Sequence, residues 1–152
     1  MAVDMVYLNR IEAEIFACFE KELMKWVNDN DYLDVVRDLK RNGMTESYIK
    51  GVIYDDLWYE FDYDSVYSEC VDFVSAKYAK GIIDAIKRDE ALYNKLLSAI
   101  DDEFGDDNDF NNPQTLAYFL IEFGFAHPDG AVDGWANYAI DDAYNIIVEM
   151  VA

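Results

Sequence analysis

Apolar residues recur every three or four positions along almost the whole chain, which is the spacing of one face of an α-helix. The clearest stripe predicts one long helix over about residues 3–28. Its members are Tyr7, Ile11, Ile15, Phe19 and Leu23. Because this period runs through a chain of 152 residues, about the length of one domain, we expect a single all-α domain over residues 1–152.

Residues that begin and end helices divide the rest of the chain. Side chains that accept a hydrogen bond from a free backbone N–H mark the starts. The predicted caps, in chain order, are Asn30 or Asp31, Thr45, Asp64 or Ser65, Asp89, and Asn112 followed by Pro113. Gly43 and Gly124 are expected to end the second and sixth helices, and residues 125–134 are expected to form a loop before a last helix. The sequence therefore predicts a bundle of six or seven helices.

One stretch departs from the helical period. Residues 58–64 read WYEFDYD, and their alternation and aromatic content favour a short extended segment as an alternative there. Elsewhere in the third and fourth helices the stripes predict a buried face, made of Tyr48, Ile49, Val52, Ile53, Leu57, Val66, Cys70, Phe73, Val74, Tyr78, Ile82, Ile83 and Ile86. Cys18 and Cys70 both lie in apolar helical patterns, so we expect free thiols in the core.

The charge of the chain is strongly acidic and unevenly placed. There are 32 Asp and Glu against 12 Lys and Arg, a formal net charge of −20. No Lys or Arg follows Lys95, whereas residues 96–152 contain 12 acids, and residues 51–76 contain seven acids and no base. Such a field repels nucleic acids and anionic membranes and attracts basic surfaces.

The acids are densest in residues 54–69, YDDLWYEFDYDSVYSE, where aromatic side chains separate them. Asp64 or Ser65 has an expected role at a helix start, where negative charge is favoured. No such role is evident for Asp55, Asp56, Glu60 and Asp62. Tyr and Trp between acids suit a protein interface, so we expect this stretch to contact a partner.

Motifs for catalysis or metal binding are weak. Residues 101–112 are rich in oxygen ligands, but with Gly105 at the sixth position of a calcium loop, Ile100 and Phe104 would fall at the first and fifth, where acids are required. The single histidine, His127, has no Glu-x-x-His partner, and neither cysteine has an evident base. We therefore expect no cofactor and no enzymatic activity.

Two segments nevertheless resemble a metal motif. Residues 55–60 and 101–106 both read DDxxx[DE], like the aspartate-rich motifs with which helical isoprenoid synthases hold magnesium and diphosphate. The chain lacks basic residues near the second segment to hold diphosphate. A magnesium-dependent all-α enzyme that uses Asp55, Asp56, Asp101 and Asp102 stays open as an alternative.

As a whole, the chain resembles the small acidic DNA-mimic inhibitors of phages and mobile elements, which include anti-restriction and anti-CRISPR proteins. The resemblance is one of type: high negative charge, helical periodicity and no active-site motif. It implies a non-enzymatic inhibitor that occupies the basic groove of a nuclease, restriction enzyme or CRISPR complex. An immunity or antitoxin-type protein that neutralises one basic toxin is the second alternative.

The sequence also predicts where the protein is located and which residues contact its partner. No signal-type segment and no apolar run of about 18–20 residues is present, so we expect a cytoplasmic protein that binds neither membranes nor nucleic acid directly. The predicted partner-binding residues are Asp55, Asp56, Tyr59, Glu60, Asp62, Tyr63, Asp101, Asp102, Glu103, Asp106, Asp107, Asp109, Asp141, Asp142 and Glu149.

Overall fold

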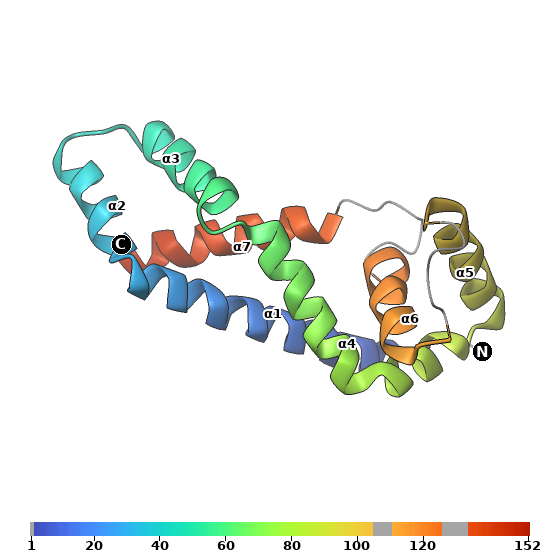
Figure 1. Cartoon of the computed structure of the whole chain (residues 1–152). Coiled ribbons are helices and arrows are strands. Elements are labelled where there is room, and N and C mark those ends of the chain that lie inside the picture. The colour runs from blue at the N-terminus through green and yellow to red at the C-terminus, as the bar shows by residue number, and fades with distance from the viewer. Residues whose placement is uncertain (1, 105–110, 126–133) are drawn as a thin grey trace. The chain divides into compact units, whose positions relative to one another are not determined.

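The computed structural model describes residues 2–104, 111–125 and 134–152, and within them it contains helices and no strands (Figure 1). The prediction of an all-α helical bundle is confirmed. Over the described residues the α-helices are α1 Met5–Asp29, α2 Tyr32–Arg41, α3 Glu46–Tyr59, α4 Tyr63–Lys87, α5 Glu90–Phe104, α6 Pro113–Phe119 and α7 Gly134–Val151. A π-helical turn, η2, continues α6 over Leu120–Phe125.

Three predicted caps are confirmed by their hydrogen bonds. The backbone N–H of Tyr48 donates to Oγ1 of Thr45 at 3.1 Å at the start of α3. The N–H of Leu92 donates to Oδ1 of Asp89 at 3.1 Å before α5. Asn112 caps α6, where its Oδ1 accepts from the N–H of Gln114 at 3.0 Å and Pro113 follows. Local side-chain chemistry thus sets where these three helices begin.

The end of α2 was also predicted correctly. Gly43 has a left-handed φ of 75°, a conformation that costs glycine little. Its N–H donates to the carbonyl of Lys40 at 3.1 Å, and the N–H of Met44 donates to the carbonyl of Leu39 at 3.2 Å. This pair of bonds is a Schellman motif, and it turns the chain from α2 into α3.

Four sequence predictions about helix ends and turns are corrected. Residues 58–64 are not extended, since α3 runs to Tyr59 and α4 begins at Tyr63. Neither Asp64 nor Ser65 caps α4: Asp62 precedes the helix with a left-handed φ of 55°, and its carbonyl accepts from the N–H of Val66 at 3.0 Å. Asp31 holds the N-cap position of α2 in a left-handed conformation but makes no side-chain cap bond. Gly124 does not end the sixth helix, because η2 continues through it.

Two aromatic residues predicted to be buried lie outside. Tyr48 is 54% exposed and Phe73 is 64% exposed. In α3 the buried residues are Ile49, Ile53 and Leu57, which stand four positions apart, so Tyr48 is turned away from them by one residue. Phe73 is adjacent in the same way to buried Val74. A one-residue step rotates a helical side chain by about 100°, enough to move it out of the core.

The chain divides into two compact units. The α3–α7 unit contains residues 16–68 and 135–152, and the α5–α6 unit contains residues 1–15 and 69–134. Helices α1 and α4 each contribute one stretch to both units.

Aromatic side chains fill the core of the α3–α7 unit. Phe19 of α1 is fully buried, and its ring centroid lies 5.7 Å from that of Phe61 and 6.4 Å from that of Tyr67. Trp26 extends this cluster, with its ring 5.4 Å from Phe61 and 4.7 Å from Tyr32. Phe61, in the short connection between α3 and α4, therefore fixes that corner against α1.

In the α5–α6 unit, the start of α1 packs closely on the second half of α4. The N–H of Asp4 donates to the carbonyl of Ala85 at 3.1 Å, and Arg88 pairs with Asp4 at 3.4 Å. The hydroxyl of Tyr78 donates to Glu14 at 2.9 Å, at the position where α4 departs from helical dihedral angles. Tyr7 of α1 lies directly against Gly81 of α4.

Replacing a helix glycine by alanine should have opposite effects on stability at Gly51 and at Gly81. A Cβ at Gly81 would fall inside van der Waals distance of the Tyr7 hydroxyl and ring, whereas a Cβ at Gly51 meets nothing within 4 Å. We expect Gly51→Ala to stabilise the protein by about 0.5–1 kcal/mol, the helix-propensity gain. We expect Gly81→Ala to destabilise it by about 1–3 kcal/mol, the cost of overpacking. Urea denaturation of both variants measures this, and equal stabilisation by the two would contradict the Tyr7–Gly81 packing.

Candidate acidic interface

The last turns of α3 expose acids and aromatic rings on one face. Trp58 and Tyr59 follow Asp55 by three and four residues, so these three side chains lie on the same side of α3, and the exposed Asp62 comes just after the helix, in the turn before α4. Trp58 is 54% exposed and Tyr59 is 74% exposed, while Ile53 and Leu57 of the same helix are fully buried. We call this group, with the exposed Glu60, the acidic-aromatic surface: Asp55, Trp58, Tyr59, Glu60 and Asp62.

Tyr63 supports this surface from inside instead of belonging to it. It is 3% exposed, so its predicted contact with a partner is corrected to a place in the core. Its ring centroid lies 5.3 Å from that of Trp58. Tyr67, also expected between the acids, is 2% exposed. Trp58 thus rests on a buried ring and keeps its outer face free for contact.

Asp56 has a structural partner that the sequence did not indicate. The hydroxyl of Tyr32 donates to Oδ2 of Asp56 at 2.7 Å, joining α2 to α3. Burial, followed by this hydrogen bond, raises the pKa of Tyr32 well above its ordinary value. Asp62 accepts a hydrogen bond at the start of α4 through its backbone carbonyl and not through its carboxylate. Over the described ranges, none of the four acids without an expected role pairs with Lys or Arg, and only Asp56 has a side-chain hydrogen bond to a distant residue.

A second hydrogen bond ties α3 to α7. The hydroxyl of Tyr54 donates to Oδ1 of Asp141 at 2.6 Å, and this bond, with burial, raises the pKa of Tyr54 to about 12. The Tyr54 and Tyr144 ring centroids are 5.1 Å apart, and Nζ of Lys50 lies 5.7 Å and 5.5 Å from the two rings. The predicted acids of α3 and of α7 therefore belong to one packed unit.

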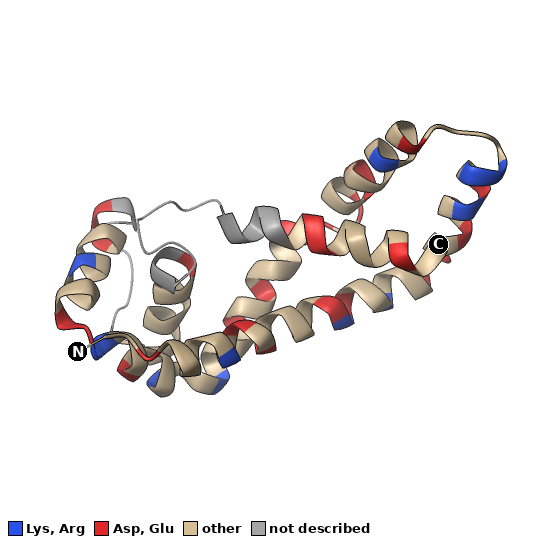
Figure 2. Ribbon diagram, turned by 180° about the vertical axis from the view of Figure 1, so that it is seen from behind, with Lys and Arg blue, Asp and Glu red and all other residues tan. Residues whose placement is uncertain are grey.

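The acids of α7 lie on its outer side. Asp141, Asp142 and Glu149 are exposed, whereas Ile140, Ala143 and Ile147 are buried. Burial raises the pKa of Asp142, and the charge of Asp141 adds to this effect. Figure 2 shows acidic residues and no basic residue on the coloured part of α7. Because these carboxylates lack a counter-charge on their own helix, they extend the negative field of the unit.

The other predicted residues fall elsewhere. Asp101 and Asp102 are exposed on α5, in the α5–α6 unit. Glu103 is within α5, but its side chain is outside the described part of the structure, as are residues Asp106, Asp107 and Asp109 and the single histidine, His127. Over the described residues no group of three or more His, Cys, Asp or Glu side chains is close enough to hold a metal ion.

Comparisons with protein-family models, with curated proteins and with solved structures gave no match. Among the helices that the structure describes, each is too short or too polar to cross a lipid bilayer.

Proposed function

We propose that this protein is a non-enzymatic inhibitor that binds the basic nucleic-acid-binding surface of another protein, as a DNA mimic does. The observation that carries the proposal is the acidic-aromatic surface of α3, which lies in the same unit as the exposed acids of α7. The target class that fits best is a defence nuclease, either a restriction enzyme or a CRISPR complex, because its groove is built to hold closely spaced phosphates.

Electrostatics supports this proposal in two ways. A net charge of −20 speeds the encounter with a basic groove and keeps nucleic acid away. Asp55, Glu60 and Asp142 are exposed without an ion pair to Lys or Arg over the described residues. Their charge is therefore available to a partner and is not consumed by contacts inside the protein.

The aromatic side chains supply a contact that charge alone does not. Exposed apolar side chains that lie next to one another mark interaction sites more than single ones do, and Trp and Tyr are enriched among residues that dominate binding energy. Trp58 is held in place by Tyr63 at 5.3 Å, so little conformational freedom is lost when it is covered. We expect Trp58 and Tyr59 to anchor the complex and the surrounding acids to orient it.

The experiment is affinity capture from the lysate of the source cell, at about 50 mM and about 500 mM salt, with captured proteins identified by mass spectrometry. We expect a nucleic-acid-binding protein to be retained at low salt and largely released at high salt, because screening shortens the Debye length from above 10 Å to below 5 Å. The captured protein should lose its DNA or RNA binding when the inhibitor is added in equal amount.

A matched pair of variants locates the interface. Asp55→Lys with Glu60→Lys reverses two charges on the acidic-aromatic surface, and Glu20→Lys with Glu22→Lys reverses two exposed charges on α1. Both pairs change the net charge equally, so the non-specific electrostatic attraction to a basic partner changes equally. We expect the first pair to reduce capture much more than the second. Retention of no nucleic-acid-binding protein, or equal loss in both pairs, contradicts the proposal.

A further inference from the structure

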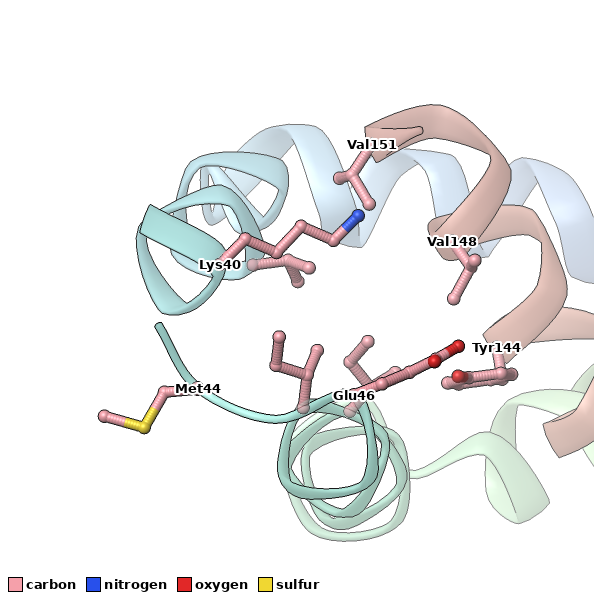
Figure 3. Close-up of a pocket in the computed structure, with 9 residues that line it drawn as sticks. Lys40, Met44, Glu46, Tyr144, Val148 and Val151 are labelled. Atoms are coloured by element: carbon pink, nitrogen blue, oxygen red, sulfur yellow. The ribbon is translucent and has the colours of Figure 1, made fainter. Parts of the chain in front are cut away.

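The α3–α7 unit contains a half-open pocket of about 270 Å³ between α2, α3 and α7 (Figure 3). All of its lining residues belong to this one unit. The apolar walls come from three helices and are formed by Val36, Ile49, Ile53, Val148 and Val151. The pocket is therefore a formed feature of the helix packing, separate from the acidic-aromatic surface at the other end of α3.

Two charged side chains stand at its rim. The Lys40 side chain reaches over the pocket towards Val151, and the Glu46 carboxylate points towards Tyr144 on the opposite wall (Figure 3). The apolar space lies between them. A bound molecule would therefore meet hydrocarbon along its length and one of these two rim groups at its end.

Neither rim group has an oppositely charged partner within 4 Å among the described residues, but Lys40 reaches across the pocket, whereas the Glu46 carboxylate points towards Tyr144 on one wall (Figure 3). The other basic residues of α2, Arg37 and Arg41, pair with Asp34 at 3.6 Å and Asp38 at 3.1 Å. Lys40 has no acidic partner within 4 Å in the part of the chain that the structure describes, although acids outnumber bases 32 to 12. An ammonium group beside an apolar cavity is complementary to a carboxylate that carries a hydrocarbon tail.

We propose that this pocket binds a small amphiphilic carboxylate, with its hydrocarbon part among the valine and isoleucine side chains and its carboxylate at Lys40. The volume fits a ligand of this size, since about 270 Å³ is just below the range of sites for drug-sized molecules, roughly 300–1,000 Å³. It corresponds to roughly nine waters at ~30 Å³ each, which suits a chain of about eight carbons. This site is additional to the proposed inhibitory function and does not depend on it.

The test uses three probes that share one tail: octanoate, 1-octanol and octylammonium. Each is titrated into the full chain labelled at the Val and Ile methyl groups, and binding is followed by NMR. We expect octanoate to shift the methyl signals of Val36, Ile49, Ile53, Val148 and Val151, with a Kd of about 1 mM, as expected for roughly ten heavy atoms. Octanol should bind more weakly, and octylammonium should bind most weakly at these methyls.

Two variants separate the head-group contact from the pocket itself. Lys40→Met keeps the length of the side chain and removes its charge, so the Kd for octanoate should rise about two- to five-fold, as for other exposed ion pairs, while octanol is unaffected. Lys21→Met is the matched control, because it makes the same charge change at an exposed site on α1. Val148→Trp should fill the pocket and remove the shifts caused by both octanoate and octanol.

The outcomes decide the proposal even if the tryptophan variant does not fold, because Lys40→Met tests it independently. Octanoate that leaves the pocket methyls unshifted overturns it. So does octylammonium binding there as tightly as octanoate, or an equal effect of Lys40→Met and Lys21→Met. Loss of the partner in affinity capture bears only on the inhibitory function, since that readout uses no amphiphile.

Discussion

Replacing Phe19 by alanine is expected to destabilise the protein by about 3–5 kcal/mol, the usual cost of removing a buried aromatic side chain. Phe19 is fully buried, and its ring contacts both Phe61 and Tyr67. The cavity would open at the point where the α3–α4 corner meets α1, so the neighbouring rings would lose contacts that they cannot regain by small movements. Since whole domains are stable by only about 5–15 kcal/mol, this one change should remove a large part of the stability.

The matched control is Phe73→Ala. Phe73 is the same residue type on a long helix, but it is 64% exposed, so we expect a change within about 0.5 kcal/mol. Urea denaturation followed by far-UV circular dichroism gives both values. A Phe73→Ala variant as destabilised as Phe19→Ala would mean that Phe73 is covered in solution, and the assignment of the core would then be wrong.

The comparison of these two phenylalanines shows how far the sequence could predict the fold. The helical spacing of the apolar residues was enough to locate the long helices. The capping side chains of Thr45, Asp89 and Asn112 located three helix starts. Both signals depend only on residues that are close together in sequence. Whether Phe73 or its neighbour Val74 faces the core depends on the angle at which other helices approach α4. That angle is set by tertiary packing, and the apolar pattern of one helix does not encode it.

The site shows the same limit. The crowding of acids at residues 54–69 was visible in the sequence, and the exposure of Asp55, Tyr59 and Glu60 agrees with it. The partners of Asp56 and Asp141 were not predictable, because each accepts from a tyrosine far away in the chain, Tyr32 and Tyr54. Tyr63 lies only one residue after the exposed Asp62, yet it is buried, since the left-handed turn at Asp62 redirects the chain.

Removing the acceptor of the hydrogen bond between Tyr32 and Asp56 is the second change expected to lower the stability of the fold strongly. We expect Asp56→Ala to destabilise the protein by about 1–3 kcal/mol, because it leaves the hydroxyl of Tyr32 buried without its acceptor. Tyr32 is 4% exposed, so water does not readily replace the lost carboxylate. Tyr32→Phe should cost less, about 0.5–1.5 kcal/mol, because it removes the buried donor and leaves Asp56, which is half-buried, able to reach water.

Two further variants make this interpretation decisive. The double variant Tyr32→Phe with Asp56→Ala should be about as stable as Tyr32→Phe alone, since no buried hydroxyl then lacks an acceptor. Asp55→Ala is the matched control, because Asp55 is the adjacent acid, is exposed and should change stability by less than about 0.5 kcal/mol. If Asp56→Ala proves as mild as Asp55→Ala in urea denaturation, then Asp56 is not held by Tyr32. It would in that case join Asp55 and Glu60 among the residues of the proposed partner interface.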